Sequence, residues 1–249
     1  MADPMSADQF IAALRREGVT VVEVDGWRTR NRNHKGPWGP VNGVMIHHTV
    51  TRGTARTVQI CRDGHADLPG PLCHGVIAKD GRVHLVGYGR ANHAGSGDDD
   101  VLQAVIAERA LPADDELTAD GNRHFWGFEC ENLGDGKDPW PEAQLLAIEK
   151  VAAAICRHHG WTERSVIGHL EWQPGKIDPR GFGMDWMRGQ VRERLKPFVT
   201  YTVRRGDTLW MIAASKLGDG NRWQEIAKLN ALKWPDDLTP GQILKLPRK

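Results

Sequence analysis

The sequence predicts an α/β fold with a mixed central sheet flanked by helices, followed by a small domain with the order strand, helix, helix, strand. Two observations support this prediction. Short apolar runs alternate with stretches of helical spacing along most of the chain, and after Pro197 the same alternation begins again on a smaller scale. We therefore expect two domains, 1–198 and 199–249, of which the second has a marginal core for its size.

The helices of the first domain are predicted from capping signals and apolar spacing. Ser6 followed by Gln9 forms a capping box, and Gly18 closes the helix that this box opens. Further helices are expected at 54–62, 101–110, 141–159 and 184–195. Strands are expected at 19–24, 43–47, 74–78, 82–86, 125–131 and 166–169, and the turn at Asp80-Gly81 joins two of them into a hairpin.

The overall composition excludes several classes of function. The chain of 249 residues is 40% hydrophobic and 26% charged, which is ordinary for a soluble protein, and its net charge of +1 argues against binding nucleic acid or membranes through bulk charge. No apolar run approaches the roughly 18 residues of a membrane span, and the first residues lack the pattern of a signal peptide. We therefore expect a cytoplasmic location in the cell that makes the protein.

The four cysteines include no Cys-x-x-Cys pair, which disfavours a structural zinc knuckle. Cys61 and Cys73 flank a loop rich in glycine and proline, and an oxidising environment would allow them to pair. Their spacing leaves a disulfide and two free thiols equally open.

Three side chains form a candidate metal site. His47 and His169 each stand at the end of a short apolar strand, and a turn set by Pro174 and Gly175 brings Asp178 back towards His169. A single histidine is more often a surface or hydrogen-bonded residue, but here three candidates each lie next to a strand end or a tight turn. Two imidazoles and a carboxylate are a ligand set of catalytic zinc, with one position left for water. We therefore expect one Zn²⁺ ion and hydrolysis of an amide by a zinc-activated water.

Lys176 and two glutamates are the candidate catalytic residues. Lys176 precedes Asp178 by two residues in extended chain, so that both side chains leave on the same side, and its ammonium can stabilise an oxyanion. Glu129 and Glu131 share one face of a strand whose other face is apolar, and both are candidates for the general base. Alternatively, either glutamate orients a ligand histidine.

His93, Asn92 and His74 are candidate substrate-binding residues. His93 and Asn92 lie in a glycine-rich loop, and a structural role for His93 is an equal alternative. His74 begins a strand and belongs either to the core or to a cleft. A nucleophilic pair of Cys73 with His74 is disfavoured because adjacent residues in a strand point to opposite faces, and the same holds for Cys130 with Glu129.

Five motifs in order carry a resemblance to a known family. They are Val-Met-Ile-His-His-Thr, Cys-His-Gly-Val-Ile-Ala-Lys-Asp-Gly, Asn-His-Ala-Gly, Trp-Gly-Phe-Glu-Cys-Glu-Asn and Gly-His-Leu-Glu-Trp-Gln-Pro-Gly-Lys-Ile-Asp-Pro-Arg-Gly. Over roughly residues 25–195 the chain resembles the zinc-dependent N-acetylmuramoyl-L-alanine amidases of the amidase-2 and peptidoglycan recognition protein superfamily.

The resemblance implies the zinc ligands His47, His169 and Asp178, with Lys176 as the oxyanion-stabilising residue. It also implies cleavage of the amide between N-acetylmuramic acid and L-alanine of the stem peptide. Many members have a cysteine as third ligand and a catalytic tyrosine before the hairpin strand, where this chain has Asp178 and Cys73. Bacterial muropeptide amidases are similar in using Asp as a ligand and a Glu in a Gly-x-Glu context, which favours Glu129 as the base, with Glu131 second.

The second domain resembles a LysM module over nearly all of residues 200–247. The segment Tyr-Thr-Val-Arg-Arg-Gly-Asp-Thr-Leu-Trp and the later Leu-Thr-Pro-Gly-Gln-Ile-Leu carry this resemblance. It implies binding of glycan that contains N-acetylglucosamine, in a groove between the first helix and the segment before the last strand. The glycan-binding candidates are Gly206, Asp207, Thr208, Trp210, Pro240 and Gly241.

The resemblances predict a modular cell-wall hydrolase that acts as a monomer on bacterial peptidoglycan, with neither nucleic acid nor membrane as partner. A phage endolysin is favoured, located in the host cytoplasm before lysis and then acting at the cell wall. Secretion by a non-classical route is the alternative location. The alternative function is a non-catalytic peptidoglycan recognition protein that only binds the wall.

Overall fold

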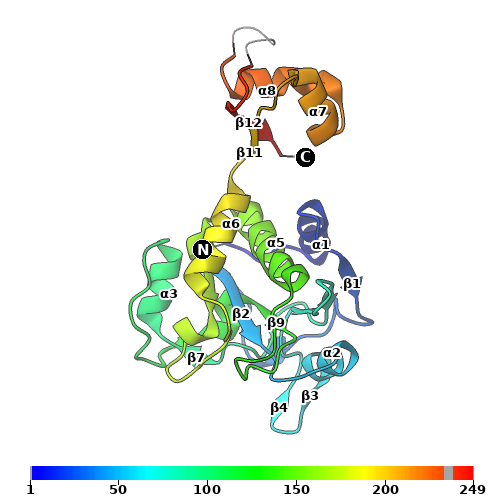
Figure 1. Cartoon of the computed structure of the whole chain (residues 1–249). Coiled ribbons are helices and arrows are strands. Elements are labelled where there is room, and N and C mark those ends of the chain that lie inside the picture. Colours follow the sequence, from blue (N-terminus) through cyan, green and yellow to red (C-terminus); the bar gives the residue numbers. More distant parts are fainter. Residues whose placement is uncertain (1, 233–237, 249) are drawn as a thin grey trace. The chain divides into compact units, whose positions relative to one another are not determined.

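The computed structural model describes residues 2–232 and 238–248, and the chain divides into two compact units, Met1–Leu195 and Lys196–Lys249 (Figure 1). Each unit has its own hydrophobic core. The division falls just before Pro197, the residue after which the sequence pattern starts again. In the described part of the chain, no helix combines the length and the apolar character needed to cross a membrane.

A six-stranded mixed sheet organises the first unit, in the order β1-β6-β5-β9-β2-β10. Neighbouring strands are parallel except for the hairpin of β5 and β6. The strands are β1 (Val21–Glu23), β2 (Gly43–His48), β5 (Gly75–Ile77), β6 (Val83–Leu85), β9 (Phe125–Cys130) and β10 (Val166–Gly168). Because β9, β2 and β10 are parallel neighbours, their carboxyl ends meet at one edge of the sheet.

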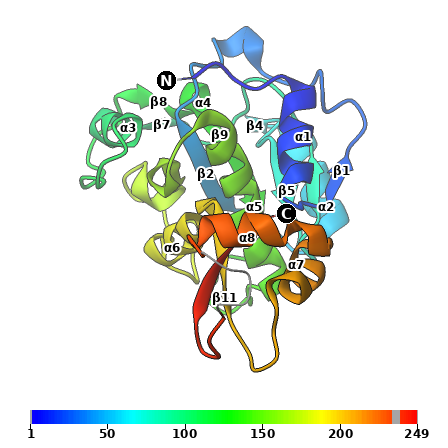
Figure 2. The ribbon, with the colours of Figure 1, turned by 90° about the horizontal axis from the view of Figure 1, so that it is seen from above.

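Three helices cover one face of this sheet: α1 (Ala7–Arg16), α5 (Glu142–His159) and α6 (Met184–Leu195). Figure 2 shows α1 and α5 side by side over the strands. Alternate residues of β2 and β9, such as Ile46 and Phe128, face these helices and are fully buried. The predicted capping box is confirmed, since Ser6 accepts the Gln9 N–H at 3.2 Å and donates its own N–H to the Gln9 side chain at 2.8 Å.

The other face of the sheet is covered by α2 (Thr54–Asp63) and α3 (Asp99–Ile106). Met45 of β2 and Phe125 of β9 pack there against Trp172. Cys61 of α2 and Cys73 lie next to each other as buried free thiols. This face continues into the polar edge where the site lies.

Short elements complete the unit. The stretch expected as a loop at 63–72 contains a two-stranded hairpin, β3 with β4, which the sequence did not predict. The short elements are η1 (Asn33–Lys35), β3 (Gly64–His65), β4 (Leu68–Pro69), β7 (Ser96–Gly97), β8 (Ala119–Asp120), α4 (Gly121–His124), η2 (Glu163–Ser165) and η3 (His169–Glu171).

The second unit has the expected order of strand, two helices and strand. β11 (Phe198–Thr202) pairs antiparallel with β12 (Ile243–Pro247), and α7 (Leu209–Leu217), η4 (Gly220–Arg222) and α8 (Trp223–Leu229) lie between them in the chain. Thr208 caps α7 by accepting the Met211 N–H at 3.2 Å. The apolar faces of both helices pack on Leu244 and Leu246 of β12.

Candidate active site

Two histidines and one aspartate meet at the carboxyl edge of the sheet. His47 is the last residue but one of strand β2, and His169 directly follows the parallel neighbour β10, so the two rings lie side by side. The Leu170 N–H donates to the Asp178 carbonyl at 2.8 Å and closes the loop that returns Asp178 to them. Asp178 Oδ2 lies 3.0 Å from His47 Nδ1 and 3.1 Å from His169 Nδ1, and the two Nδ1 atoms are 3.1 Å apart.

This cluster fits a zinc ion by its chemistry. Burial lowers the pKa of His47 to about 4, so this ring is neutral at physiological pH. Burial alone would raise the pKa of Asp178, but His169 and His47 lower it well below its usual value, so this group is a carboxylate. Two nitrogen ligands and one oxygen ligand whose coordinating atoms all lie within 4.8 Å of one another match the ligand number and types of a catalytic zinc site.

The cluster lies in a cleft of about 560 Å³ that also contains Glu129 and Lys176. The cleft therefore brings together the three expected metal ligands with Lys176 and Glu129, while the second candidate base, Glu131, is not part of its lining. Its wall also carries apolar side chains that the sequence analysis did not single out, namely Val50, Leu68, Leu72 and Ile177. Three of these are strongly exposed, which gives the cleft an apolar rim.

The structure distinguishes Glu129 from Glu131. Glu129 lies beside His47 in the paired strands, lines the cleft, and has a buried Oε2 without a hydrogen-bond partner in the described chain. Burial, together with the charge of Asp178, raises the pKa of Glu129 to about 8. Glu131 instead accepts the Gly53 N–H at 2.8 Å and the Thr54 hydroxyl at 2.7 Å. Glu131 therefore caps the amino terminus of α2, where Gly53 has no side chain to do so.

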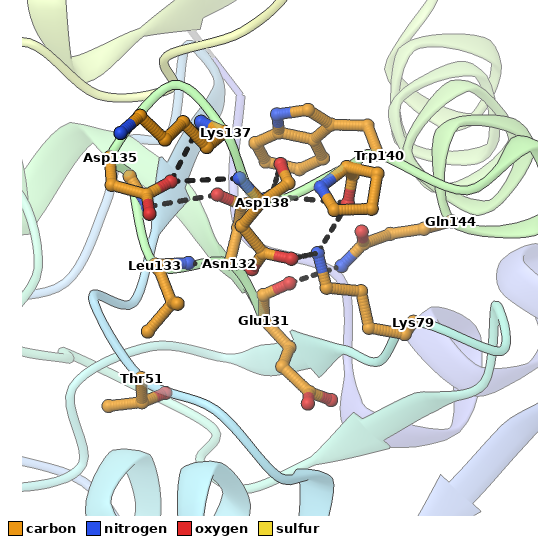
Figure 3. Close-up of polar contacts among 12 residues, drawn as sticks. Thr51, Lys79, Glu131, Asn132, Leu133, Asp135, Lys137, Asp138, Trp140 and Gln144 are labelled. Carbon is orange, nitrogen blue, oxygen red and sulfur yellow. Dashed lines mark hydrogen bonds and ion pairs between the residues drawn. The ribbon is translucent and has the colours of Figure 1, made fainter.

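The segment after β9 is held by a dense set of polar contacts (Figure 3). Gln144 donates to the Glu131 carbonyl at 2.9 Å, and in Figure 3 the Glu131 carboxylate points away from this network. Asp138 accepts the Leu133 N–H at 2.9 Å and forms an ion pair with Lys79 at 3.0 Å. These contacts tie the end of β9 to α5 and to the turn between β5 and β6.

His48 connects this segment to the loop that carries Asp178. The His48 ring packs against Gly134, where a Cβ atom would lie only 2.2 Å from Nε2. Its Nδ1 accepts the Arg180 N–H at 3.1 Å, two residues beyond Asp178. The backbone just after Asp178 is therefore held by His48, whose ring packs against the segment that follows β9.

The three candidate substrate-binding residues lie in different environments. Asn92 lines the cleft and donates to the Pro69 carbonyl at 3.3 Å. His93 also borders the cleft, but it is only 8% exposed and both ring nitrogens have partners. His74 is fully buried outside the cleft lining, so the expected substrate contact is corrected to an internal position.

His74 has a structural environment. Its Nδ1 accepts the Gly127 N–H at 2.9 Å, and its Nε2 lies 2.9 Å from the Gly89 carbonyl. Both ring nitrogens are therefore used by backbone groups. Burial lowers the pKa of His74 to about 4, so the ring stays neutral.

Gln173 is a further residue of the site that the sequence analysis missed. Its Oε1 lies 3.1 Å from His169 Nε2, opposite the nitrogen that faces the cluster. The only signal in the sequence was its place four residues after His169, which is not distinctive. Gln173 also lines the cleft.

A larger cavity of about 700 Å³ lies between α6 and the loop after α3. Its charged groups are largely paired, since Arg188 bonds Glu171 at 2.8 Å and Arg192 bonds Glu163 at 2.8 Å. It contains none of the predicted site residues.

The glycan-binding candidates of the second unit surround the amino terminus of α7 and the turn before β12. Trp210 is 56% exposed on α7, whereas Asp207 is used internally by the Tyr201 hydroxyl and the Arg204 N–H, both at 2.7 Å. Gly206 and Gly241 adopt positive φ angles of 88° and 90°, which favour glycine. Pro240 precedes Gly241, and part of the segment expected to line the groove, residues 233–237, lies outside the described residues.

Two families match the chain. Residues 37–181, more than half of the chain, match the family described as N-acetylmuramoyl-L-alanine amidase (Amidase_2), and residues 201–247 match the LysM domain.

Individual proteins are similar over parts of the chain. The endolysin N-acetylmuramoyl-L-alanine amidase LysCS from Clostridium intestinale URNW is 17% identical with a TM-score of 0.45, over 69% of this chain and 94% of that one. AmpDH3 from Pseudomonas aeruginosa, in complex with anhydromuramic pentapeptide, is 18% identical with a TM-score of 0.45, over 84% and 79%. The uncharacterized protein YqbP of Bacillus subtilis is 38% identical over 60 residues, which are 20% of this chain and 27% of that protein. The chain spans about a third or less of the length of the curated relatives that it matches.

The two glutamates of β9 and its end should differ in their effect on stability. We expect Glu131→Gln to lower the free energy of unfolding by about 1–2 kcal/mol, because it removes a charged cap from α2. Glu129→Gln removes no hydrogen bond to the buried Oε2 and should not destabilise the protein. Urea denaturation of both variants at pH 7 tests this, and equal losses would contradict the assignment.

His74 should make the protein less stable in acid. Its folded pKa of about 4 lies below the unfolded value of 6.5, so the unfolded chain binds a proton first as the pH falls. The contribution is complete above pH 6.5 and is lost between pH 6.5 and 4, by about 3 kcal/mol. Urea denaturation across this window should show a shallower pH dependence for His74→Gln than for the wild type. Parallel profiles would refute this role.

Proposed function

Because the chain belongs to the N-acetylmuramoyl-L-alanine amidase family (Amidase_2), we propose that it hydrolyses the amide between N-acetylmuramic acid and L-alanine of the peptidoglycan stem peptide. The observation that carries this proposal is the meeting of His47, His169 and Asp178 in one cleft with Glu129 and Lys176.

We propose that His47 Nδ1, His169 Nδ1 and Asp178 Oδ2 hold one zinc ion. When bound, such an ion polarises a carbonyl group and lowers the pKa of water. The two histidines are themselves buried, which strengthens electrostatic interactions around them.

Glu129 is the proposed general base and acid. Its carboxylate would take a proton from the attacking water and return it to the leaving amine. Burial and Asp178 raise its pKa towards the physiological range, and the charge of Lys176 opposes this shift. A group whose pKa lies near the working pH can both accept and return a proton. Glu131, with both oxygens bonded at the start of α2, is not suited to this role.

Lys176 is the proposed oxyanion-stabilising residue. Its positive charge lowers the pKa values of both His47 and Glu129, so its field reaches the reacting region. An ammonium group there stabilises the negative oxygen that develops as the amide carbonyl is attacked.

The LysM unit is proposed to bind the N-acetylglucosamine-containing glycan, which would raise the effective concentration of the catalytic unit at the wall. The exposed Trp210 and the backbone around Gly206 and Gly241 are the proposed contacts. A catalytic unit joined to a wall-binding unit suits an enzyme that degrades intact walls, and we propose that it serves as a phage endolysin.

Release of new amino-terminal alanine from purified walls tests the activity. It should be abolished by a metal chelator, restored by zinc, and absent in His169→Ala. A wild-type protein that binds both zinc and walls but releases no alanine would instead be a recognition protein.

Glu129→Gln should lower turnover by at least about 100-fold while zinc content stays at one ion per chain. Glu131→Gln is the matched control and should keep turnover per folded molecule, because its carboxylate lies outside the cleft. Alanine release and metal analysis on the two purified variants measure both quantities. A greater loss of turnover in Glu131→Gln would reverse the assignment.

Truncation after Leu195 should separate the two units. The first unit keeps its whole core, so we expect hydrolysis of a soluble muropeptide at the wild-type rate and weaker sedimentation with walls. Unchanged wall binding would show that the LysM unit is not the anchor.

A further inference from the structure

We propose that His93 is the positioning residue of this site, which directs the His47 ring and keeps the His47 Nδ1 lone pair free for the metal. This inference rests on the proposed zinc site. It assigns to His93 a role in place of the substrate contact expected from the sequence.

His93 lies between His47 and the backbone of β9. Its Nδ1 is 3.1 Å from His47 Nε2, and its Nε2 is 3.2 Å from the Phe125 carbonyl oxygen. The rings of His93 and His47 are nearly perpendicular, at 84°. A continuous line of hydrogen-bonding groups thus runs from the backbone of β9 to the metal cluster.

The Phe125 carbonyl determines which group donates in each of these hydrogen bonds. A carbonyl oxygen only accepts, so His93 must carry its proton on Nε2. A neutral imidazole has one N–H, and His93 Nδ1 is therefore an acceptor. His47 must then donate from Nε2, which leaves its Nδ1 without a proton, facing His169 and Asp178.

The opposite arrangement would leave unpaired acceptors inside the protein. If His47 carried its proton on Nδ1, its Nε2 lone pair would face His93 Nδ1. His93 could then donate only by moving its proton to Nδ1, and its Nε2 would face the Phe125 carbonyl as a second acceptor. Buried acceptors that face each other are unfavourable.

The fold fixes His93 firmly in this place. Asn122 Oδ1 accepts the backbone N–H groups of His93 at 2.8 Å and of Ala94 at 2.9 Å. The ring packs on Gly127 of β9, where a Cβ atom would lie 2.4 Å from it. The glycine of the Gly-x-Glu segment therefore makes room for His93, two residues before the proposed base Glu129.

The second ligand histidine is oriented differently. His169 Nε2 lies 3.1 Å from the Oε1 of Gln173, a side chain that lines the cleft. The partner of His47 also borders the cleft, but it is only 8% exposed and its far nitrogen meets a backbone carbonyl, which no side-chain motion can redirect. His93 is thus the more rigid of the two supports.

The position of the proton on His93 is the direct test. Imidazole ¹⁵N NMR of the wild-type protein, metal-free and zinc-loaded, should show a protonated Nε2 and an unprotonated Nδ1 for His93 in both states. A proton on His93 Nδ1 would overturn the inference, whatever the activity of the protein.

Zinc affinity is the second test, measured by competition with a chromogenic chelator. In His93→Gln the amide nitrogen can still reach the Phe125 carbonyl, but the amide oxygen then lies away from the position of Nδ1 and cannot accept from His47, so affinity should fall about 10- to 100-fold. His93→Asn places a carbonyl oxygen near the position of Nδ1 and should recover part of this loss. His74→Gln is the matched control, because His74 is equally internal and its ring nitrogens bond backbone atoms, and its affinity should stay close to the wild type.

The two proposals can fail separately. Wild-type zinc affinity in His93→Gln, with wall hydrolysis intact, would remove the inference and leave the function. Lower affinity in His93→Gln and the predicted His93 proton, without any wall hydrolysis, would support the inference and remove the function.

Discussion

The structure of the first unit depends on keeping several polar side chains at one buried edge of an apolar sheet. His47, His169, Asp178 and Glu129 all come from the ends of parallel neighbouring strands or the loop beside them, where desolvation opposes any charge. Such a cluster persists only if its members satisfy one another or share a cation, and if the surrounding backbone cannot relax. The well-packed opposite face, under α1, α5 and α6, supplies that rigidity.

Much of the fold was predictable because the signals are local. The capping box at Ser6, the proline before α5 and the left-handed Gly160 after it each mark a helix end through contacts within one turn. The two histidines could be placed at strand ends from apolar runs alone. The two rings meet because β2 and β10 are parallel neighbours. This pairing is a property of the strand order in the sheet, and neither segment alone predicts it.

The features that the sequence did not predict depend mostly on contacts between segments that are far apart in the chain. Glu129 and Glu131 share a strand face, and they differ because the start of α2, nearly 80 residues earlier, reaches Glu131 alone. The sequence left the roles of His74, at the start of a strand, and His93, in a loop, open, because it does not show that His74 bonds backbone groups while His93 bonds His47. The β3–β4 hairpin escaped because strands of two residues show no periodicity.

The β3–β4 hairpin contributes to the shape of the cleft but not to its polar cluster. Leu68 of the hairpin forms part of the cleft wall, while the backbone of the hairpin is held by other groups, such as the Arg32 side chain, which donates to the Pro69 carbonyl at 2.5 Å. Within the described residues, no hydrogen bond joins the hairpin to His47, His169 or Asp178. Variation at 64–69 would therefore reshape the entrance of the cleft without changing the contacts among His47, His169 and Asp178. For any redesign of the cleft entrance, the hairpin is therefore the segment to vary first.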